Sequence, residues 1–139
     1  MSDPAVKELV AAAREARAQA YARYSGYTVG AAIRAASGKI YAGCNVENAA
    51  YPLSQCAEAN AVAAMVLGGD QEIAAVAVVG PGGEAPCTPC GGCRQMLAEF
   101  SDAGVMVHIC GPDDSIAEEA LGDLIPHAFG PKNLDKAED

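Results

Sequence analysis

Residues Ile73–Val79 have the sequence IAAVAVV, a continuous apolar run that is rich in valine and is followed by the turn-forming residues 80–83 (GPGG). Such a run is typical of a strand that is covered on both faces of a sheet. A second apolar segment, Val105–Cys110, follows a Pro/Gly-rich loop and a short helix that we expect from about Cys93 to Phe100. A strand, a helix and a strand at this spacing predict a parallel, right-handed crossover.

The flanking sequence adds elements of both types to this unit. We therefore predict a single α/β domain over residues 1–139, with a mixed sheet between helices in a three-layer α-β-α arrangement. The charged residues 136–139 are expected to be a mobile tail. The further elements expected are a helix from Pro4 to about Tyr21 capped by Asp3, a hairpin of Thr28–Ala35 and Lys39–Gly43, a loop over Asn45–Gln55, a helix over Ala57–Leu67, a short helix near Ile116–Leu124 and a loop over Pro126–Pro131.

Composition excludes several classes of protein. The chain has 139 residues, of which 51% are hydrophobic and 19% charged, so it can bury a core and is not disordered in bulk. Its 9 Lys and Arg face 18 Asp and Glu, a net charge of −9, and no basic run is available to neutralise phosphates. Nucleic-acid and membrane partners are thus disfavoured, and a small uncharged substrate suits the chain better. The N-terminus does not have the pattern of a secretory signal, so a cytoplasmic location is expected.

The cysteines indicate a metal site rather than disulfides, because the chain has six of them without a secretory signal. Cys90 and Cys93 follow Pro89 on a turn that opens a helix, and Cys56 begins another helix. The positive end of a helix dipole favours the thiolate form that a metal requires. Three thiolates predict a zinc site with one tetrahedral position open, as in catalytic sites, and Glu58 is expected near a water in that position.

Other interpretations of the cysteines remain open at this point. A structural zinc site would need a fourth ligand, whereas Cys56 has no cysteine two or three residues away. Residues 87–93 contain two overlapping C-x-x-C pairs, so an iron–sulfur cluster or a redox dithiol is also conceivable, although neither requires Glu58. Five residues are expected to stay outside the metal site: Cys87 as a bystander, Cys44 and Cys110 as buried apolar residues, and His108 and His127 as structural residues.

Together these residues resemble the cytidine deaminases of the small, nucleoside-specific, zinc-dependent type. The sequence C-A-E at 56–58 followed by P-C-G-G-C at 89–93 is the signature of zinc deaminases. Three more segments are similar to segments of that family, and the likeness runs from about residue 24 to residue 134. They are Tyr24–Ala32 (YSGYTVGAA), Gly43–Ala49 (GCNVENA) and Leu124–Phe129 (LIPHAF).

The resemblance implies hydrolysis of cytidine and 2'-deoxycytidine to the uridines with release of ammonia, a step of pyrimidine salvage. It makes Cys56, Cys90 and Cys93 the ligands of one Zn²⁺ per chain and Glu58 the proton shuttle. The remaining residues are assigned by the resemblance to the substrate or to the surroundings of the thiolates. Ala57 N–H and the Thr88 carbonyl hold the base, Asn45 and Glu47 bind the ribose, and Arg94 and Gln95 donate to the thiolates.

Two further expectations concern aromatic residues and assembly. Tyr27 occupies a position where the family commonly has a phenylalanine against the base, and its additional hydroxyl must be paired or hydrated. Phe129 resembles an aromatic residue that reaches the pocket of a neighbouring subunit, and Ala49 and Tyr51 lie in a segment at the same kind of interface. Short members of the family are homotetramers, so the resemblance implies a tetramer with shared active sites.

The chain departs from the family after the catalytic glutamate, where Ala59 replaces the arginine of many short members and removes one cation near the thiolates. Two alternatives to a cytidine deaminase are compatible with parts of the sequence. A deaminase of another cytosine nucleoside, such as the blasticidin S type, shares the C-A-E and P-C-G-x-C-R-Q segments, but the intact Asn45–Asn48 segment favours an ordinary ribose. A non-catalytic zinc-binding subunit is the other alternative, and the presence of Glu58 argues against it.

Overall fold

A five-stranded mixed sheet forms the centre of the structure, a computed structural model that describes residues 3–82, 86–111 and 116–135. Its strand order is β2-β1-β3-β4-β5. The β3–β4 pair is parallel and the other three pairs are antiparallel, which confirms the predicted mixed sheet and the parallel pair that follows the apolar run. The strands are β1 (Gly30–Ala35), β2 (Ile40–Cys44), β3 (Ile73–Val79), β4 (Met106–Cys110) and β5 (Ile116–Ala120).

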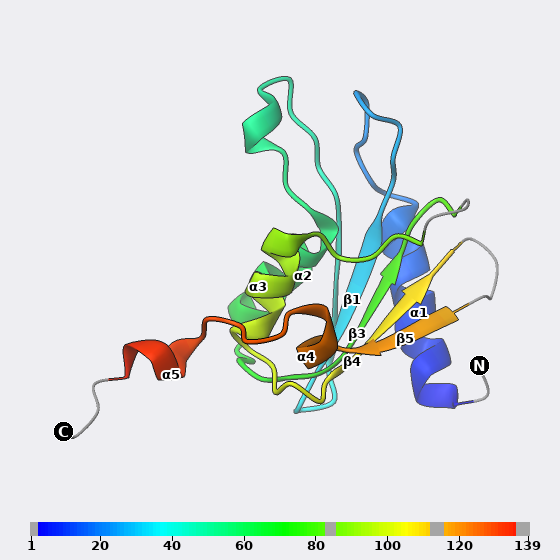
Figure 1. The fold of residues 1–139 in the computed structure, drawn as a ribbon. Helices are drawn as coiled ribbons and strands as arrows, with labels where there is room; N and C mark the ends of the chain where they lie inside the picture. The colour runs from blue at the N-terminus through cyan, green and yellow to red at the C-terminus, as the bar shows by residue number, and fades with distance from the viewer. Residues whose placement is uncertain (1–2, 83–85, 112–115, 136–139) are drawn as a thin grey trace.

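Helices cover both faces of this sheet (Figure 1), as the three-layer prediction requires. On one face, α1 (Pro4–Arg17) buries Leu9, Val10 and Ala13 against the sheet. Asp3 caps α1 through a hydrogen bond of 2.9 Å from the Ala5 N–H to its carboxylate. The other face carries α2 (Ala57–Leu67) and α3 (Gly91–Ala98).

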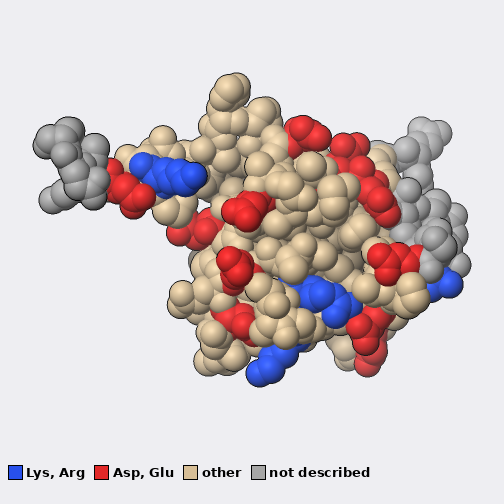
Figure 2. Space-filling model, turned by 90° about the horizontal axis from the view of Figure 1, so that it is seen from below, with Lys and Arg blue, Asp and Glu red and all other residues tan. Residues whose placement is uncertain are grey.

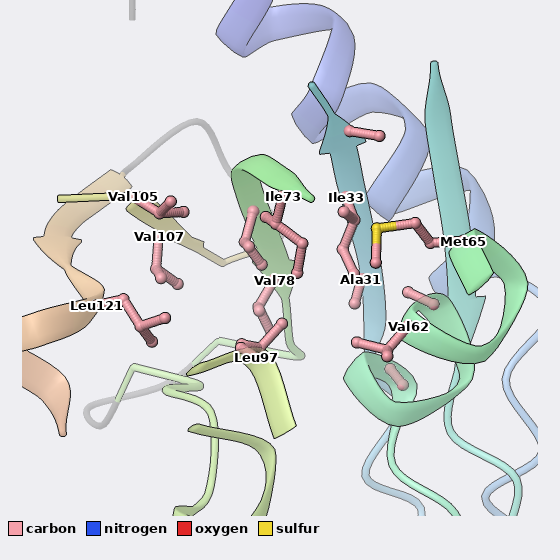
Figure 3. Packing of buried hydrophobic residues seen from close by; sticks show 14 of the residues in the cluster. Ala31, Ile33, Val62, Met65, Ile73, Val78, Leu97, Val105, Val107 and Leu121 are labelled. Atoms are coloured by element: carbon pink, nitrogen blue, oxygen red, sulfur yellow. The ribbon is translucent and has the colours of Figure 1, made fainter. Parts of the chain in front are cut away.

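The larger hydrophobic cluster lies between the sheet and these two helices (Figure 3). Met65 of α2, Leu97 of α3 and Ile33 of β1 are fully buried in it. Burial of apolar surface contributes roughly 25 cal/mol per Å², so this cluster fixes α2 and α3 firmly to the sheet. The N-termini of both helices, where the cysteines lie, are thereby held in place.

One close approach positions α2 along the sheet. A Cβ atom on Gly43 of β2 would lie 2.6 Å from the Ala57 carbonyl oxygen and 2.5 Å from the Ala61 nitrogen. Only glycine lets the first turn of α2 lie directly on the end of β2. The Gly43–Ala49 segment of the sequence and the start of α2 are consequently neighbours in space.

Two segments differ from the sequence prediction. α1 ends at Arg17 rather than near Tyr21, and residues 18–29 form a loop that leads to β1. The stretch Ile116–Leu124, predicted as one helix, is the strand β5 followed by the single turn α4 (Leu121–Leu124). Its Ala, Glu and Leu residues favour a helix locally, but pairing with β4 gives its backbone hydrogen bonds as an edge strand, and tertiary pairing outweighs propensity.

The C-terminal segment contains a helix turn, α5 (Pro131–Leu134), directly after the predicted loop. Figure 1 shows α5 extending away from the sheet and its covering helices. The predicted mobile tail, 136–139, lies outside the described residues.

Among the described residues, none of the helices is both long and apolar enough to cross a membrane. The face in Figure 2 carries scattered acidic side chains and a few basic ones, without a continuous basic surface on that side.

Candidate metal centre and active site

Three cysteines meet where α2 and α3 begin. Cys56 is the N-cap of α2, Cys90 is the N-cap of α3, and Cys93 lies in the first turn of α3. Their Sγ atoms all lie within 4.8 Å of one another, and this is the group of potential metal ligands found in the part of the chain that the structure describes. Three thiolates around one point match the soft, tetrahedral ligand set that zinc prefers. The residues present therefore fit a zinc ion.

The electrostatics of these thiols favour a cation between them. Burial, followed by the charges of Glu58, Cys56 and Cys90, raises the pKa of Cys93. Burial also raises the pKa of Cys56, whereas the backbone N–H of Cys93 lowers the pKa of Cys90. Without a positive ion the three thiolates repel one another, and a divalent cation removes this repulsion.

Glu58 lies in the first turn of α2 beside this cluster and is only 5% exposed. Burial is the main cause that raises the pKa of its carboxyl group. A carboxyl group in such an environment holds a proton at higher pH than an exposed one, which suits a group that must both accept and donate a proton.

A cavity of about 290 Å³ opens onto the cluster. Its wall contains eight of the residues predicted from the sequence: Tyr27, Asn45, Glu47, Cys56, Ala57, Glu58, Thr88 and Cys90. Ser25, Val29, Ser54, Gln55 and Cys87 also line it and were not predicted as substrate-binding residues. Its wall combines two groups of side chains: the thiols with Glu58, which we call the metal end, and Asn45 with Glu47, which we call the sugar end because ribose binding is predicted there. The volume suits a small molecule of nucleoside size.

Two loops, residues 18–29 and 45–56, extend from the same edge of the sheet (Figure 1) and contribute Ser25, Tyr27, Asn45 and Glu47 to the cavity wall. A short β-bridge between Tyr21 and Val46 joins them. The Asn45 side chain accepts a hydrogen bond of 2.8 Å from the Val29 N–H and donates one of 2.8 Å to the Tyr27 carbonyl. The predicted ribose-binding residue Asn45 thus also holds the two loops together.

The Glu47 carboxylate also accepts hydrogen bonds from the protein itself. One of its carboxylate oxygens accepts from the Tyr24 N–H at 2.9 Å and from the Ser25 N–H at 3.0 Å, and the other accepts from the Ser25 hydroxyl. The Ser25 hydroxyl is the main cause that lowers the pKa of Glu47. Its carboxylate is therefore ionised and held at the wall of the cavity.

The other predicted residues lie outside this cavity. Tyr51, in the single turn η1 (Tyr51–Leu53), packs edge-to-face on Tyr24 with ring centroids 5.9 Å apart and lines a smaller neighbouring cavity. Phe129 lines another cavity, near α4 and α5. Ala49, which lies in the segment predicted to form a subunit interface, is exposed.

The side chains of Arg94 and Gln95 bind backbone carbonyls. Arg94 donates to the carbonyls of Pro89 and Leu124, both at 2.8 Å. Gln95 donates to the Phe129 carbonyl at 2.7 Å. Arg94 thus binds the backbone directly before Cys90, and direct donation to the thiolates stays a prediction.

Comparison with known proteins decides the family. Residues 4–109 match the family described as the cytidine and deoxycytidylate deaminase zinc-binding region. The chain belongs to this family. Its matched region includes all three cysteines of the cluster and Glu58.

Relatives and solved structures of this deaminase family agree with the fold. A cytidine deaminase of Sporosarcina psychrophila is 42% identical over 132 residues, which cover 95% of this chain and 96% of that protein. The crystal structure of the Burkholderia pseudomallei cytidine deaminase matches with a TM-score of 0.83 and 41% identity over 88% of this chain and 98% of that one. The Mycobacterium tuberculosis cytidine deaminase structure matches with a TM-score of 0.79 and 38% identity, over 92% of this chain and 99% of that one.

Proposed function

We propose that this deaminase-family chain catalyses the zinc-dependent hydrolysis of cytidine and 2'-deoxycytidine to uridine and 2'-deoxyuridine, with release of ammonia. The observation that carries the proposal is the meeting of three thiols and the buried Glu58 at one end of a cavity of about 290 Å³. The relatives named cytidine deaminase, which align with almost the whole chain, support the substrate class.

Cys56, Cys90 and Cys93 would hold one zinc ion per chain, and the thiolate set is chemically suited to it. When bound, the ion supplies Lewis-acid chemistry, which lowers the pKa of water toward neutrality. With three protein ligands the remaining tetrahedral position is available for that water.

Glu58 moves protons in this proposal. Its carboxylate accepts a proton from the attacking water and delivers one to N3 of the base, while a C–O bond forms at C4. The same carboxylate then takes the proton of the new C4 hydroxyl and delivers it to the exocyclic amine, so that the C4–N4 bond breaks, the C4 oxygen becomes the carbonyl of uracil, and ammonia leaves. Water and cytidine are consumed and uridine and ammonia are formed, so the reaction needs no other reactant. The burial that raises the pKa of Glu58 supports this two-way role.

Backbone and loop groups orient the substrate in this proposal. The Ala57 N–H donates to the ring oxygen, and the Thr88 carbonyl accepts from the exocyclic amine, which directs C4 toward the metal cluster. Asn45 and Glu47 bind the ribose hydroxyls with the lone pairs and the N–H that their internal bonds leave available. The wall position of all four residues in one cavity supports these assignments.

We further propose a homotetramer whose subunits share active sites through Phe129, Ala49 and Tyr51. The supporting observation is that Tyr51 and Phe129 are 70% and 56% exposed, so that both aromatic residues are available to a partner surface. A cytoplasmic site of action is part of the proposal as well, and it agrees with the six free cysteines, since disulfides are rare there.

An ultraviolet assay of cytidine loss with the purified, zinc-loaded protein tests the proposed reaction. Uridine and ammonia should appear in equal amounts. A protein that binds zinc but leaves cytidine and 2'-deoxycytidine unchanged would contradict it, and turnover of blasticidin S in place of both would identify a different cytosine nucleoside as the substrate.

A further inference from the structure

Hydrogen bonds with neighbouring side chains hold the backbone of Tyr27 in place. Its N–H donates to the Ser25 hydroxyl at 2.9 Å, and its carbonyl accepts from Asn45 Nδ2 at 2.8 Å. The carbonyl of the next residue, Thr28, accepts from Arg17 Nε at 3.0 Å. The position of the Tyr27 Cα atom is therefore fixed, and the freedom that remains is rotation of its side chain.

The far end of the Tyr27 ring meets Cys87. The phenol donates a hydrogen bond to the Cys87 thiol, and this bond is the main cause that raises the pKa of Tyr27 to about 12. Cys87 is half-buried and packs on Gly80, directly after β3. A Cβ atom on Gly80 would lie 2.3 Å from Cys87 Cβ, 2.8 Å from its Sγ and 3.6 Å from the Tyr27 hydroxyl oxygen. The three residues fit together only because position 80 has no side chain.

The Tyr27–Cys87 pair lies in the wall of the proposed nucleoside cavity. The backbone of Tyr27 is bound to Asn45, at the predicted sugar end. Cys87 lies near Glu58, since the Glu58 charge contributes to raising the pKa of the Cys87 thiol. The Tyr27 ring thus extends between the two ends of the cavity, and it is 44% exposed.

We propose that Cys87 is a positioning residue for the proposed reaction: its sulfur holds the Tyr27 ring against the cavity wall, so that the ring forms a preorganised surface for the pyrimidine base. The inference rests on the proposed function for the identity of the substrate. It gives Cys87 a task other than metal binding, in agreement with its absence from the group of cysteines within 4.8 Å of one another.

A ring without this bond has several rotamers available, and substrate binding must then immobilise it. Ordering one such side chain weakens the affinity for the substrate by roughly 2- to 10-fold. Cys87→Ala and Tyr27→Phe should each raise the KM for cytidine by about this factor, with kcat within about twofold of the unchanged protein. The double variant should be no worse than either single variant, because both remove the same hydrogen bond.

A spectroscopic measurement tests the same contact without turnover. The protein is labelled with 3-fluorotyrosine, and the Tyr27 signal is assigned as the ¹⁹F resonance missing from Tyr27→Phe. Cys87→Ala should shift or broaden this resonance and weaken the binding of uridine in calorimetry. Cys87→Ser, which keeps an acceptor, should resemble the unchanged protein more closely than Cys87→Ala does. Cys44→Ala, which removes a partly buried thiol outside the cavity, is the matched control. It should change neither the Tyr27 resonance nor the binding of uridine.

The outcomes separate this inference from the proposed function. An unchanged Tyr27 resonance in Cys87→Ala, additive effects in the double variant, or a Cys87→Ser variant as impaired as Cys87→Ala would overturn the positioning role. Absence of cytidine turnover in the zinc-loaded parent protein would overturn the proposed function, whereas the ¹⁹F comparison would still decide whether Cys87 holds the ring.

Discussion

The two ends of the cavity are built differently. At the metal end, the cysteines and Glu58 lie in or next to the first turns of two helices that pack on the core through residues such as Met65 and Leu97. At the sugar end, Asn45 and Glu47 lie in loops held by side-chain-to-backbone hydrogen bonds, with little apolar burial around them. Apolar packing of the two helices therefore holds the metal end, whereas a few hydrogen bonds order the sugar end. Substitutions at the metal end should therefore affect chemistry, and those at the sugar end should affect binding and local order.

The largest effect is expected from a metal ligand. Cys93→Ala removes one of three thiolates, so zinc content should fall from about one per chain toward zero. Activity should fall at least about 10³-fold, because Lewis-acid stabilisation is worth several kcal/mol. Elemental analysis and the cytidine assay check both numbers.

Cys87→Ser is the matched control for this variant, since Cys87 lies three positions before Cys90 but outside the cluster. It should retain about one zinc per chain, as a site with three protein ligands requires. Loss of zinc in Cys87→Ser with retention in Cys93→Ala would mean that the ligand set is wrong.

Asn45→Ala tests the sugar end. It removes a partly buried hydrogen bond from the Val29 N–H and an exposed one to the Tyr27 carbonyl, and the loss of two such bonds costs about 1–3 kcal/mol of unfolding free energy. KM for cytidine should rise about tenfold or more, since a site that binds a hydroxyl loses its partner, while zinc content stays unchanged. Urea unfolding and steady-state kinetics provide the measurements.

Asn48→Ala is the control for the loss of an amide in the same loop. The Asn48 side chain accepts a local hydrogen bond of 2.9 Å from the Ala50 N–H in an exposed position. Its removal should cost less stability than Asn45→Ala and leave KM near that of the parent. Equal effects of the two substitutions would show that Asn45 has no special part at the sugar end.

A smaller effect is expected from Phe129→Ala. If an aromatic group of one subunit completes the cavity of another, KM should rise about fivefold while zinc content stays at about one per chain, because partial loss of such a hydrophobic contact costs about 1 kcal/mol. Light scattering should give the mass of a tetramer for the parent protein. A fully active monomer would contradict the shared site.

The smallest effect concerns the charge of Glu47. Hydrogen bonding, chiefly from Ser25, lowers the pKa of this carboxyl group below the ordinary value of 4.5. A depressed pKa in the folded state means that the contribution of the carboxylate to loop order is fully present above pH 4.5 and is lost as the pH falls through the lower, folded-state value. The amide ¹⁵N and ¹H shifts of Tyr24 and Ser25 should titrate in that lower range.

Glu47→Gln should abolish that titration, because the amide carries no proton that ionises there. Persistence of the same amide titration in Glu47→Gln would show that another group causes it.

The same contrast explains how much the sequence could predict. The metal end follows from cysteine spacing and helix starts, which are local signals, and β3 follows from its apolar run. The hydrogen bonds of Asn45 with Tyr27 and Val29 join residues 16 to 18 positions apart. No local sequence pattern predicts such contacts. The contact between Tyr27 and Cys87 is more distant still, although the extra hydroxyl at position 27 was a signal that a partner was needed.

The error at Ile116–Leu124 has a related cause. The sequence IAEEALGDL is rich in the helix formers Ala, Glu and Leu, and pairing with the neighbouring strand β4 makes its first half an edge strand. Residues such as Ser54 and Gln55 were missed at the cavity for a similar reason, since polar loop residues are common and only the tertiary structure selects those that face the site.

The central claim is that the cysteine cluster and Glu58 form a catalytic zinc centre for cytidine. Its most direct test is Glu58→Gln, which keeps the shape of the side chain and removes the proton carrier, with zinc content, uridine binding and cytidine turnover measured on one preparation. General acid–base groups contribute about 10²–10⁴-fold to rate. The account predicts about one zinc per chain, retained uridine binding and turnover at least about 10²-fold slower than in the parent. Near-normal turnover in a zinc-loaded Glu58→Gln variant would contradict it.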